Sequence, residues 1–239
     1  MLIFGYESLW TKGLTKYKGS INFPDGLCYS RRGFVSRPWF PGKIGKVEQK
    51  NEAFLGWGGA SSVGSAAVQL ANTLGYKVFT TASPKHHKYL KSIGAFATFD
   101  YRDPEVVKKV VDSVKSSGVN LIIGFDAITE GDTSRLSADI LIATGKGSGK
   151  LVLTLAWPEE HAKPEGVEIL NTQAIRLGTD SQDIGAWFFN DFLKDALEKK
   201  YFVAAPPIEI VEGGIWATQK VFDKLKAGVS GKKLVVRVE

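Results

Sequence analysis

Hydrophobic residues from position 53 onward alternate between short apolar runs and stretches in which they recur every three or four positions. The runs predict strands at residues 53–57, 77–81, 96–99, 119–125 and 150–155. The three-to-four spacing predicts helices at residues 62–74, 84–93, 104–115 and 136–144. Because each strand leads into a helix through a short connection, the strands have to run parallel, with helices on both faces. The pattern therefore predicts an α/β fold built on a doubly wound parallel sheet.

The two ends of the chain follow different patterns. Residues 1–50 are rich in glycine and proline and keep neither a helical nor a strand period for long, so we expect them to be irregular. After a long helix expected at residues 184–199, the last part of the chain holds a short strand at 207–211, a helix at 216–226 and a strand at 233–238.

The turn between the first strand and its helix is rich in glycine. Gly59 and Gly64 occupy the first and last glycine positions of the dinucleotide-binding fingerprint G-x-G-x-x-G, and Ser61 replaces the middle glycine. Gly59 is expected to allow the tight turn, and Gly64 to let the helix pack closely on the strand. We expect the Ser61 hydroxyl to donate a hydrogen bond to a pyrophosphate at the helix N-terminus. A slightly displaced phosphate and an ordinary strand-to-helix turn are the alternatives.

Acidic residues are absent between Ala53 and Phe99. A fold of this kind that binds NAD usually places an acid about 20 residues after the glycines, where it holds the ribose 2′-hydroxyl. Here the segment Thr80 to His86 offers hydroxyls and cations only, which suits a 2′-phosphate and favours NADP over NAD. The alternative is that residues 85–88 are the solvated start of a helix. Tyr101, after the third strand, is expected to cover the adenine or reach the phosphate, unless it is a plain turn residue.

Composition narrows the function classes. The 239-residue chain has a formal net charge of +6, but its lysines are scattered and no nucleic-acid motif occurs, which favours an anionic small ligand over nucleic acid. One cysteine and three histidines supply neither a disulfide nor a Cys₄ zinc site, so we expect no metal and a reducing, cytoplasmic location. No apolar run approaches the ~18 residues of a membrane span, and no membrane partner is expected.

Several segments, taken together and in their order, resemble the medium-chain dehydrogenase/reductase superfamily. The resemblance is to its zinc-independent quinone-oxidoreductase and fungal trans-acting enoyl-reductase branch, and it runs from about Ala53 to Glu239. The segments are Trp57–Gly64, Thr80–Lys85, Gly94–Ala95, Phe99–Arg102 and Gly228–Val235.

This resemblance implies an NADP site formed by five parts of the chain. Its residues would be Ala60, Ser61, Ser62, Val63, Gly64, Ser83, Pro84, Lys85, His86, Tyr101, Leu177, Gly178, Val229 and Ser230. The first five would meet the pyrophosphate, and Ser83 to His86 with Tyr101 would surround the 2′-phosphorylated adenosine. Leu177 and Gly178 would lie near the nicotinamide, and Val229 and Ser230 would contact the cofactor from the C-terminal part.

The resemblance also implies how the chain is divided. In the family, a nucleotide-binding domain stands between an N-terminal GroES-like substrate domain and a C-terminal return segment. Residues 51–200 match the nucleotide-binding (Rossmann) domain, and residues 201–239 match the return segment. A full substrate domain needs on the order of 100 residues, so the irregular residues 1–50 would be a remnant or a substitute, and the chain is expected to be truncated. Strands 207–211 and 233–238 would then have lost pairing surface, an opportunity for self-association.

The function implied is hydride transfer from NADPH to an activated C=C bond or carbonyl of a small enoyl, enone or quinone substrate. The sequence assembles no catalytic constellation, so no catalytic residue is assigned, and turnover is expected to be impaired. A non-catalytic NADP-binding module and a non-functional fragment are the alternatives.

Overall fold

The computed structural model describes residues 2–3, 51–145, 149–174, 179 and 182–238. The leucine-, valine- and isoleucine-rich runs form a six-stranded parallel sheet in the order β4-β3-β2-β5-β6-β7. Its strands are β2 (Glu52–Trp57), β3 (Lys77–Thr81), β4 (Ala95–Phe99), β5 (Asn120–Asp126), β6 (Gly149–Leu153) and β7 (Val167–Asn171). This is the strand order of a doubly wound dinucleotide-binding fold, so the predicted fold class is confirmed.

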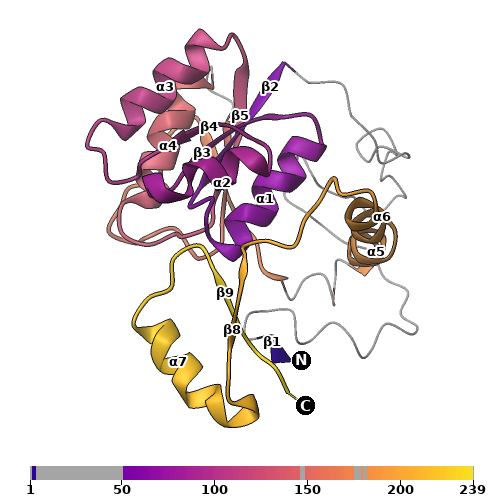
Figure 1. The fold of residues 1–239 in the computed structure, drawn as a ribbon. Helices are drawn as coiled ribbons and strands as arrows, with labels where there is room; N and C mark the ends of the chain where they lie inside the picture. The colour runs from indigo at the N-terminus through magenta and orange to yellow at the C-terminus, as the bar shows by residue number, and fades with distance from the viewer. Residues whose placement is uncertain (1, 4–50, 146–148, 175–178, 180–181, 239) are drawn as a thin grey trace.

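Helices cover both faces of the sheet (Figure 1). They are α1 (Ser62–Thr73), α2 (His87–Ser92), which follows the 3-10 turn η1 (Pro84–His86), α3 (Val106–Ser116) and α4 (Thr133–Thr144). The valine stripe of α3 packs with α4 and with Leu121 of β5 on one face, where Val110 and Val114 are buried. On the other face, Val68 of α1 and Leu90 of α2 pack with Val78 of β3. Each helix thus buries the apolar stripe from which it was predicted.

One strand was missed, and one predicted helix is interrupted. Strand β7 escaped the pattern because its five residues, VEILN, end in asparagine and carry a glutamate in place of a continuous apolar run. The long helix expected at 184–199 is interrupted, since α5 (Gln182–Ala186) and α6 (Leu193–Glu198) flank a π-helical turn, η3 (Trp187–Phe192). In that turn the Phe188 and Phe192 rings stack with centroids 5.5 Å apart, and Phe192 is buried. Periodicity alone does not distinguish such a turn from regular helix.

A smaller C-terminal unit carries the sheet β1-β9-β8, which lies below the larger unit in Figure 1, with β8 and β9 in orange to yellow and β1 in indigo. Strand β8 (Ile208–Val211) runs parallel to β9 (Lys233–Val236), and β1 (Leu2–Ile3) pairs antiparallel with the other side of β9. The helix α7 (Thr218–Lys226), preceded by the 3-10 turn η4 (Gly214–Ala217), packs Val221 against Leu234 and Val236. Strand β9 is therefore paired on both sides, which the sequence did not suggest, and β8 and the two-residue β1 are the edge strands of this sheet among the described residues.

An ion-pair cluster joins the parts of this unit. The Glu209 carboxylate on β8 accepts hydrogen bonds from Lys224 of α7 and, at 2.9 Å, from Lys232 next to β9. The two ammonium groups lower the pKa of Glu209 to about 2. Because the carboxylate is exposed, this pairing orients α7 more than it stabilises the unit.

A buried amide connects the larger unit to the segment that leads into the C-terminal one. Gln69, in the middle of α1 and 2% exposed, accepts a hydrogen bond from the Val203 amide at 2.8 Å and donates one to the Val203 carbonyl at 3.2 Å. A side-chain amide that satisfies both groups of one residue holds that backbone as a neighbouring strand would.

None of the described helices combines the length and the apolar character that crossing a bilayer requires.

The difference in core size between the two sheets predicts unequal protection of their amides. Among the described residues, the buried apolar cluster of the C-terminal unit comprises Val211, Ala217, Val221, Leu234 and Val236, with Val229 packed against it, whereas two larger clusters enclose the six-stranded sheet. We expect amides of β8 and β9 to exchange with deuterium faster than those of β2, β3 and β5, measured by hydrogen exchange with mass spectrometry. Equal protection of both sheets would contradict this expectation.

Candidate functional site

A cavity lies at the carboxyl ends of the parallel strands, where the strand order reverses. The chain passes from β2 to β3 on one side and later returns to β5 on the other, so the loops after β2 and β5 diverge and leave a crevice. The cavity has a volume of about 370 Å³, within the range of small-molecule sites. Its lining residues are Trp57, Gly58, Ala60, Ser61, Ala82, Ser83, His86, Tyr101, Ile128, Thr133, Val229, Ser230 and Gly231.

Three glycines shape the turn at the base of this cavity, but not in the roles expected. The left-handed φ of +77° belongs to Gly58, so Gly58 and not Gly59 makes the tight turn. A Cβ at Gly59 would lie 2.2 Å from Thr80 Oγ1, so Gly59 allows close approach to β3. A Cβ at Gly64 would lie 2.2 Å from the Gly58 carbonyl oxygen, which confirms Gly64 as the residue that lets α1 pack on the turn.

Ser61 is the N-cap of α1. Its Oγ accepts a hydrogen bond of 2.9 Å from the Gly64 amide, a role the sequence analysis did not anticipate. The Gly64 amide is thus already bonded, which removes it from the amides expected at the pyrophosphate. A hydroxyl that accepts one bond keeps its own hydrogen for a further donation. Ala60 and Ser61 line the cavity, whereas Ser62 and Val63 are exposed beside it.

The threonines at the end of β3 hold the turn and do not face the cavity. Thr80 Oγ1 donates to the Gly56 carbonyl at 2.6 Å, and Thr81 Oγ1 accepts from the Gly58 amide at 3.1 Å. Both side chains are fully buried. The expectation that these two hydroxyls belong to a phosphate-binding corner is therefore wrong, because both side chains are buried against the turn and neither residue lines the cavity.

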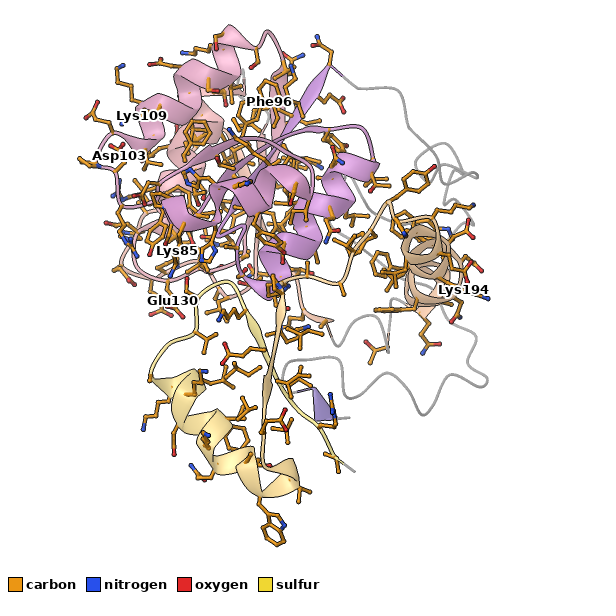
Figure 2. The ribbon with its side chains drawn as sticks, in the orientation of Figure 1. Lys85, Phe96, Asp103, Lys109, Glu130 and Lys194 are labelled. Carbon is orange, nitrogen blue, oxygen red and sulfur yellow. The ribbon has the colours of Figure 1, made fainter. Side chains whose placement is uncertain are left out.

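The residues after β3 separate into two groups. Ser83 and His86 line the cavity, while Pro84 and Lys85 are exposed and stand outside its lining. Figure 2 shows Lys85 on the side of the larger unit that faces the C-terminal segment. Burial, followed by the positive charges of Lys85 and His87, lowers the pKa of His86. Lys85 and His87 thus add positive charge near His86, and an anion in the cavity would offset it.

Two further segments complete the rim. Tyr101, after β4, lines the cavity with 42% of its surface exposed, and the Arg102 guanidinium lies 4.9 Å from the centre of its ring. Val229 and Ser230 line the cavity from the C-terminal unit, as expected. The predicted residues Leu177 and Gly178 lie outside the described part of the chain.

The loop after β5 supplies lining residues that the sequence analysis missed, namely Ile128 and Thr133. The rule used for Tyr101, that loops at the carboxyl ends of strands surround the ligand, applies equally here. The Ile128 side chain fills the space beside Gly58, because a Cβ on that glycine would lie 2.5 Å from it. Ile128 and the glycine turn thus face each other across the switch point.

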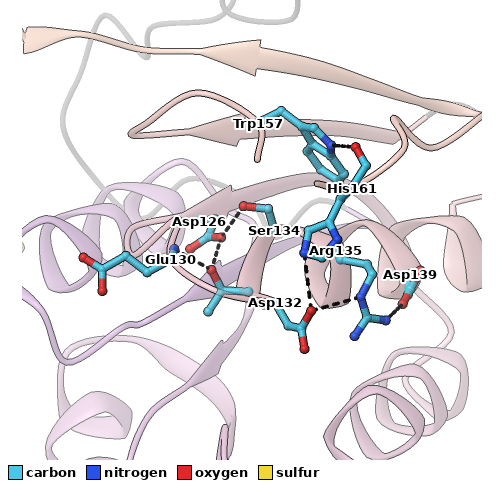
Figure 3. Close-up of polar contacts among 9 residues, drawn as sticks. Asp126, Glu130, Asp132, Ser134, Arg135, Asp139, Trp157 and His161 are labelled. Atoms are coloured by element: carbon cyan, nitrogen blue, oxygen red, sulfur yellow. Dashed lines mark hydrogen bonds and ion pairs between the residues drawn. The ribbon is translucent and has the colours of Figure 1, made fainter. Parts of the chain in front are cut away.

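Asp126, the last residue of β5, organises this loop (Figure 3). Its fully buried carboxylate accepts hydrogen bonds from the Ile128 and Thr129 amides, both at 2.9 Å. It also accepts from the Thr133 and Ser134 hydroxyls at 2.7 and 3.2 Å. Four donors compensate the buried charge and hold Ile128 and Thr133 at the cavity.

A second polar network lies farther along α4 and on its surface. Asp132 contacts Arg135 Nε at 3.3 Å and His161 Nε2 at 3.4 Å, and Arg135 also reaches Asp139 (Figure 3). The guanidinium of Arg135 lowers the pKa of Asp132. This network attaches the loop after β6 to α4 and does not reach the cavity.

The described residues contain no group of three or more His, Cys, Asp or Glu side chains arranged to hold a metal ion.

Comparison with known proteins places this geometry in a family. Residues 62–156 match the family model described as zinc-binding dehydrogenase. The trans-enoyl reductase tndF of Aspergillus flavipes is 37% identical over 187 residues, which cover 77% of this chain and 53% of tndF. The chain belongs to the medium-chain dehydrogenase/reductase superfamily.

Solved structures agree on the fold of this superfamily member. The quinone oxidoreductase of Pseudomonas syringae pv. Tomato DC3000 matches with a TM-score of 0.61 at 22% identity, over 80% of this chain and 58% of that one. A structure described as the ETR1P/NADP/crotonyl-CoA complex matches with a TM-score of 0.61 at 15% identity, over 83% of this chain and 57% of that one. The chain spans about half the length of the curated relatives it matches.

The Asp126 network predicts a specific loss of stability. In Asp126→Ala, the Ile128 and Thr129 amides and the Thr133 and Ser134 hydroxyls all lose their shared acceptor, so we expect the free energy of unfolding to fall by about 2–4 kcal/mol in urea denaturation. The matched control is Asp139→Ala, which removes an exposed partner of Arg135 at 3.3 Å and should change the free energy by less than about 0.5 kcal/mol. Similar small changes in both variants would show that Asp126 does not hold the loop.

Proposed function

We propose that this chain binds NADP(H) in the cavity at the switch point and belongs to an oxidoreductase that transfers hydride. The carrying observation is that loops from β2, β3, β4 and β5 and the segment Val229–Gly231 all converge on one cavity. In doubly wound folds, this position outside the carboxyl ends of the strands is where dinucleotides bind. The protein described as the ETR1P/NADP/crotonyl-CoA complex, which shares the fold, supports the same choice of cofactor.

The pyrophosphate would lie at the start of α1. The first amides of a helix lack acceptors within the helix and carry partial positive charge, and the amides of Ser62 and Val63 belong to this first turn. The Ser61 hydroxyl retains its hydrogen for an oxyanion, since the N-cap bond uses only its lone pair. Gly58 and Ala60 add backbone without bulky side chains at the approach.

The adenosine end would lie between Ser83, His86 and Tyr101. Two features support a 2′-phosphate there. The end of β3 has no acid to hold a free 2′-hydroxyl, and Lys85 and His87 surround His86 with positive charge. The acid after β4, Asp100, accepts a hydrogen bond from the Arg102 amide at 3.1 Å. NADP is therefore proposed over NAD.

The proposed reaction is hydride transfer to an activated C=C bond or carbonyl of a small enoyl, enone or quinone substrate. When bound, the nicotinamide supplies the hydride. The residues of this chain bind and orient the cofactor, and none of the described ones is assigned to the chemical step. The relatives named trans-enoyl reductase support this class of reaction. We propose that the reaction is zinc-independent, since the 239 residues include one cysteine and three histidines.

Further proposals concern organisation and location. Residues 51–200 would form the nucleotide-binding domain and residues 201–239 the return segment of a substrate domain. The edge strand β8 supports self-association as a proposal. The single cysteine supports a reducing, cytoplasmic location.

A non-catalytic NADP-binding module is the second candidate. It is favoured by one observation, that the described residues lining the cavity suit the binding of a cofactor and none of them is assigned to the chemical step.

Titration with NADPH separates these candidates. If the chain is either an active oxidoreductase or a non-catalytic NADP-binding module, NADPH fluorescence should change on binding. Oxidation of NADPH with a quinone or an enoyl thioester should occur only if the chain is an active oxidoreductase. A fluorescence signal that stays constant up to millimolar protein would refute cofactor binding.

Charge reversal at Lys85 tests the 2′-phosphate. The ammonium group stands close enough to lower the pKa of His86, so Lys85→Glu should weaken NADPH binding by about tenfold or more and NADH binding far less. The matched control is Lys91→Glu, which makes the same charge change near the end of α2 and should leave both affinities within about twofold. Equal weakening of NADPH and NADH in Lys85→Glu would remove the 2′-phosphate assignment.

A further inference from the structure

One hydrogen bond crosses the mouth of the cavity and joins its two walls. His86 Nε2 lies 2.8 Å from Ser230 Oγ, so the end of η1 contacts the loop between α7 and β9. The next residue has to be small, because a Cβ on Gly231 would lie 2.3 Å from His86 Cε1. Gly231 also has a φ of +64°, a conformation that favours glycine. The C-terminal loop is thus shaped to seat against the imidazole.

The charges around His86 bias this contact. Lys85 and His87, on the same turn and the following helix, are the charged groups that act on the imidazole, and both disfavour its protonation. From the loop after β4, Tyr101 is the other titratable residue in the cavity lining, and the lining residues from α4 and the C-terminal loop carry no titratable side chain. Lys232, the next cation along that loop, is paired with Glu209. Without an anion, burial and these positive groups therefore favour the neutral form of His86.

A neutral imidazole and a hydroxyl satisfy each other, with either one as the donor. An anion between them shifts the equilibrium from the neutral towards the protonated imidazole. A protonated imidazole donates from both nitrogens, and a nearby phosphate stabilises that charged form. The Ser230 hydroxyl also carries a hydrogen that an oxyanion accepts.

We propose that His86 and Ser230 form a proton-coupled clasp, closed on each other when the cavity is empty and turned together onto the 2′-phosphate when NADP(H) binds. The proposal rests on the proposed function and adds a regulation to it. Binding transfers one proton from solvent to His86, forming an N–H bond on the imidazole without any redox change. The affinity for NADPH therefore rises as the pH falls from the pKa of His86 in the complex towards its lower value in the free protein. The affinity for NADH, which has no 2′-phosphate, lacks this dependence.

The experiment measures dissociation constants of the full chain for NADPH and NADH between pH 6 and 8, by NADPH fluorescence and by calorimetry in two buffers of different ionisation enthalpy. For the wild type, we expect the dissociation constant for NADPH to rise by up to about tenfold per pH unit as the pH increases from the pKa of His86 in the free protein to its pKa in the complex. Calorimetry should show proton uptake on binding within this range. His86→Asn should lose this slope and the uptake. The matched control is His161→Asn, whose imidazole lies 3.4 Å from Asp132 outside the cavity and which should keep both.

Comparison with His86→Asn also removes the contribution of the phosphate itself, whose second pKa is near ~6. Ser230→Ala provides an independent measurement. It should weaken NADPH binding by about three- to tenfold while keeping a pH slope, because His86 remains.

The outcomes separate the two proposals. A wild type that does not bind NADPH overturns the proposed function and the clasp together. NADPH binding with the same pH slope in wild type and His86→Asn, or with unchanged affinity in Ser230→Ala, overturns the clasp alone.

Discussion

The hydrogen bonds between the end of β3 and the glycine turn are the constraint on which the site depends. The Thr80 hydroxyl donates to the Gly56 carbonyl, and Thr81 receives the Gly58 amide on its hydroxyl and the Gly59 amide on its carbonyl. These bonds fix the turn before α1 against the neighbouring strand, with Gly59 pressed on Thr80. The position of the first helical turn, and therefore of the cavity floor, follows from them. A side chain at position 59 would push the turn after β2 away from β3, at the point where the ligand would enter.

Much of the fold was predictable from the sequence because a parallel sheet covered on both faces needs continuous apolar strands and amphipathic helices. Strand β3 was predicted residue for residue, and the stripe of α3 buried the valines expected of it. The π-helical turn was not predictable, because a one-residue change in hydrogen-bonding register leaves the spacing of aromatic residues almost unchanged. Strand β7 was missed because an edge strand has one neighbour and tolerates polar residues.

The cavity was predicted less completely for two physical reasons. The sequence of a turn does not show whether a threonine or serine hydroxyl faces a ligand or bonds the backbone. Thr80 and Thr81 were therefore wrongly assigned to the phosphate corner, and the capping role of Ser61 was not predicted. The structural role of Asp126 could not be predicted, because its four hydrogen-bond donors are identified only in the folded structure. In contrast, His86 and Ser230 are separated by 144 positions, and only the resemblance to a family brought both into one prediction.

Helix α1 links the cavity to the segment that leads into the C-terminal unit. The N-terminal turn of α1 borders the cavity, and Gln69 in the middle of the helix holds the backbone of Val203 through a pair of hydrogen bonds. Because a rigid helix moves as one body, a displacement of its first turn also displaces the residues that are hydrogen-bonded to its middle. Any shift of the first turn of α1 as the site fills would therefore be passed, through this amide, to the peptide leading into β8.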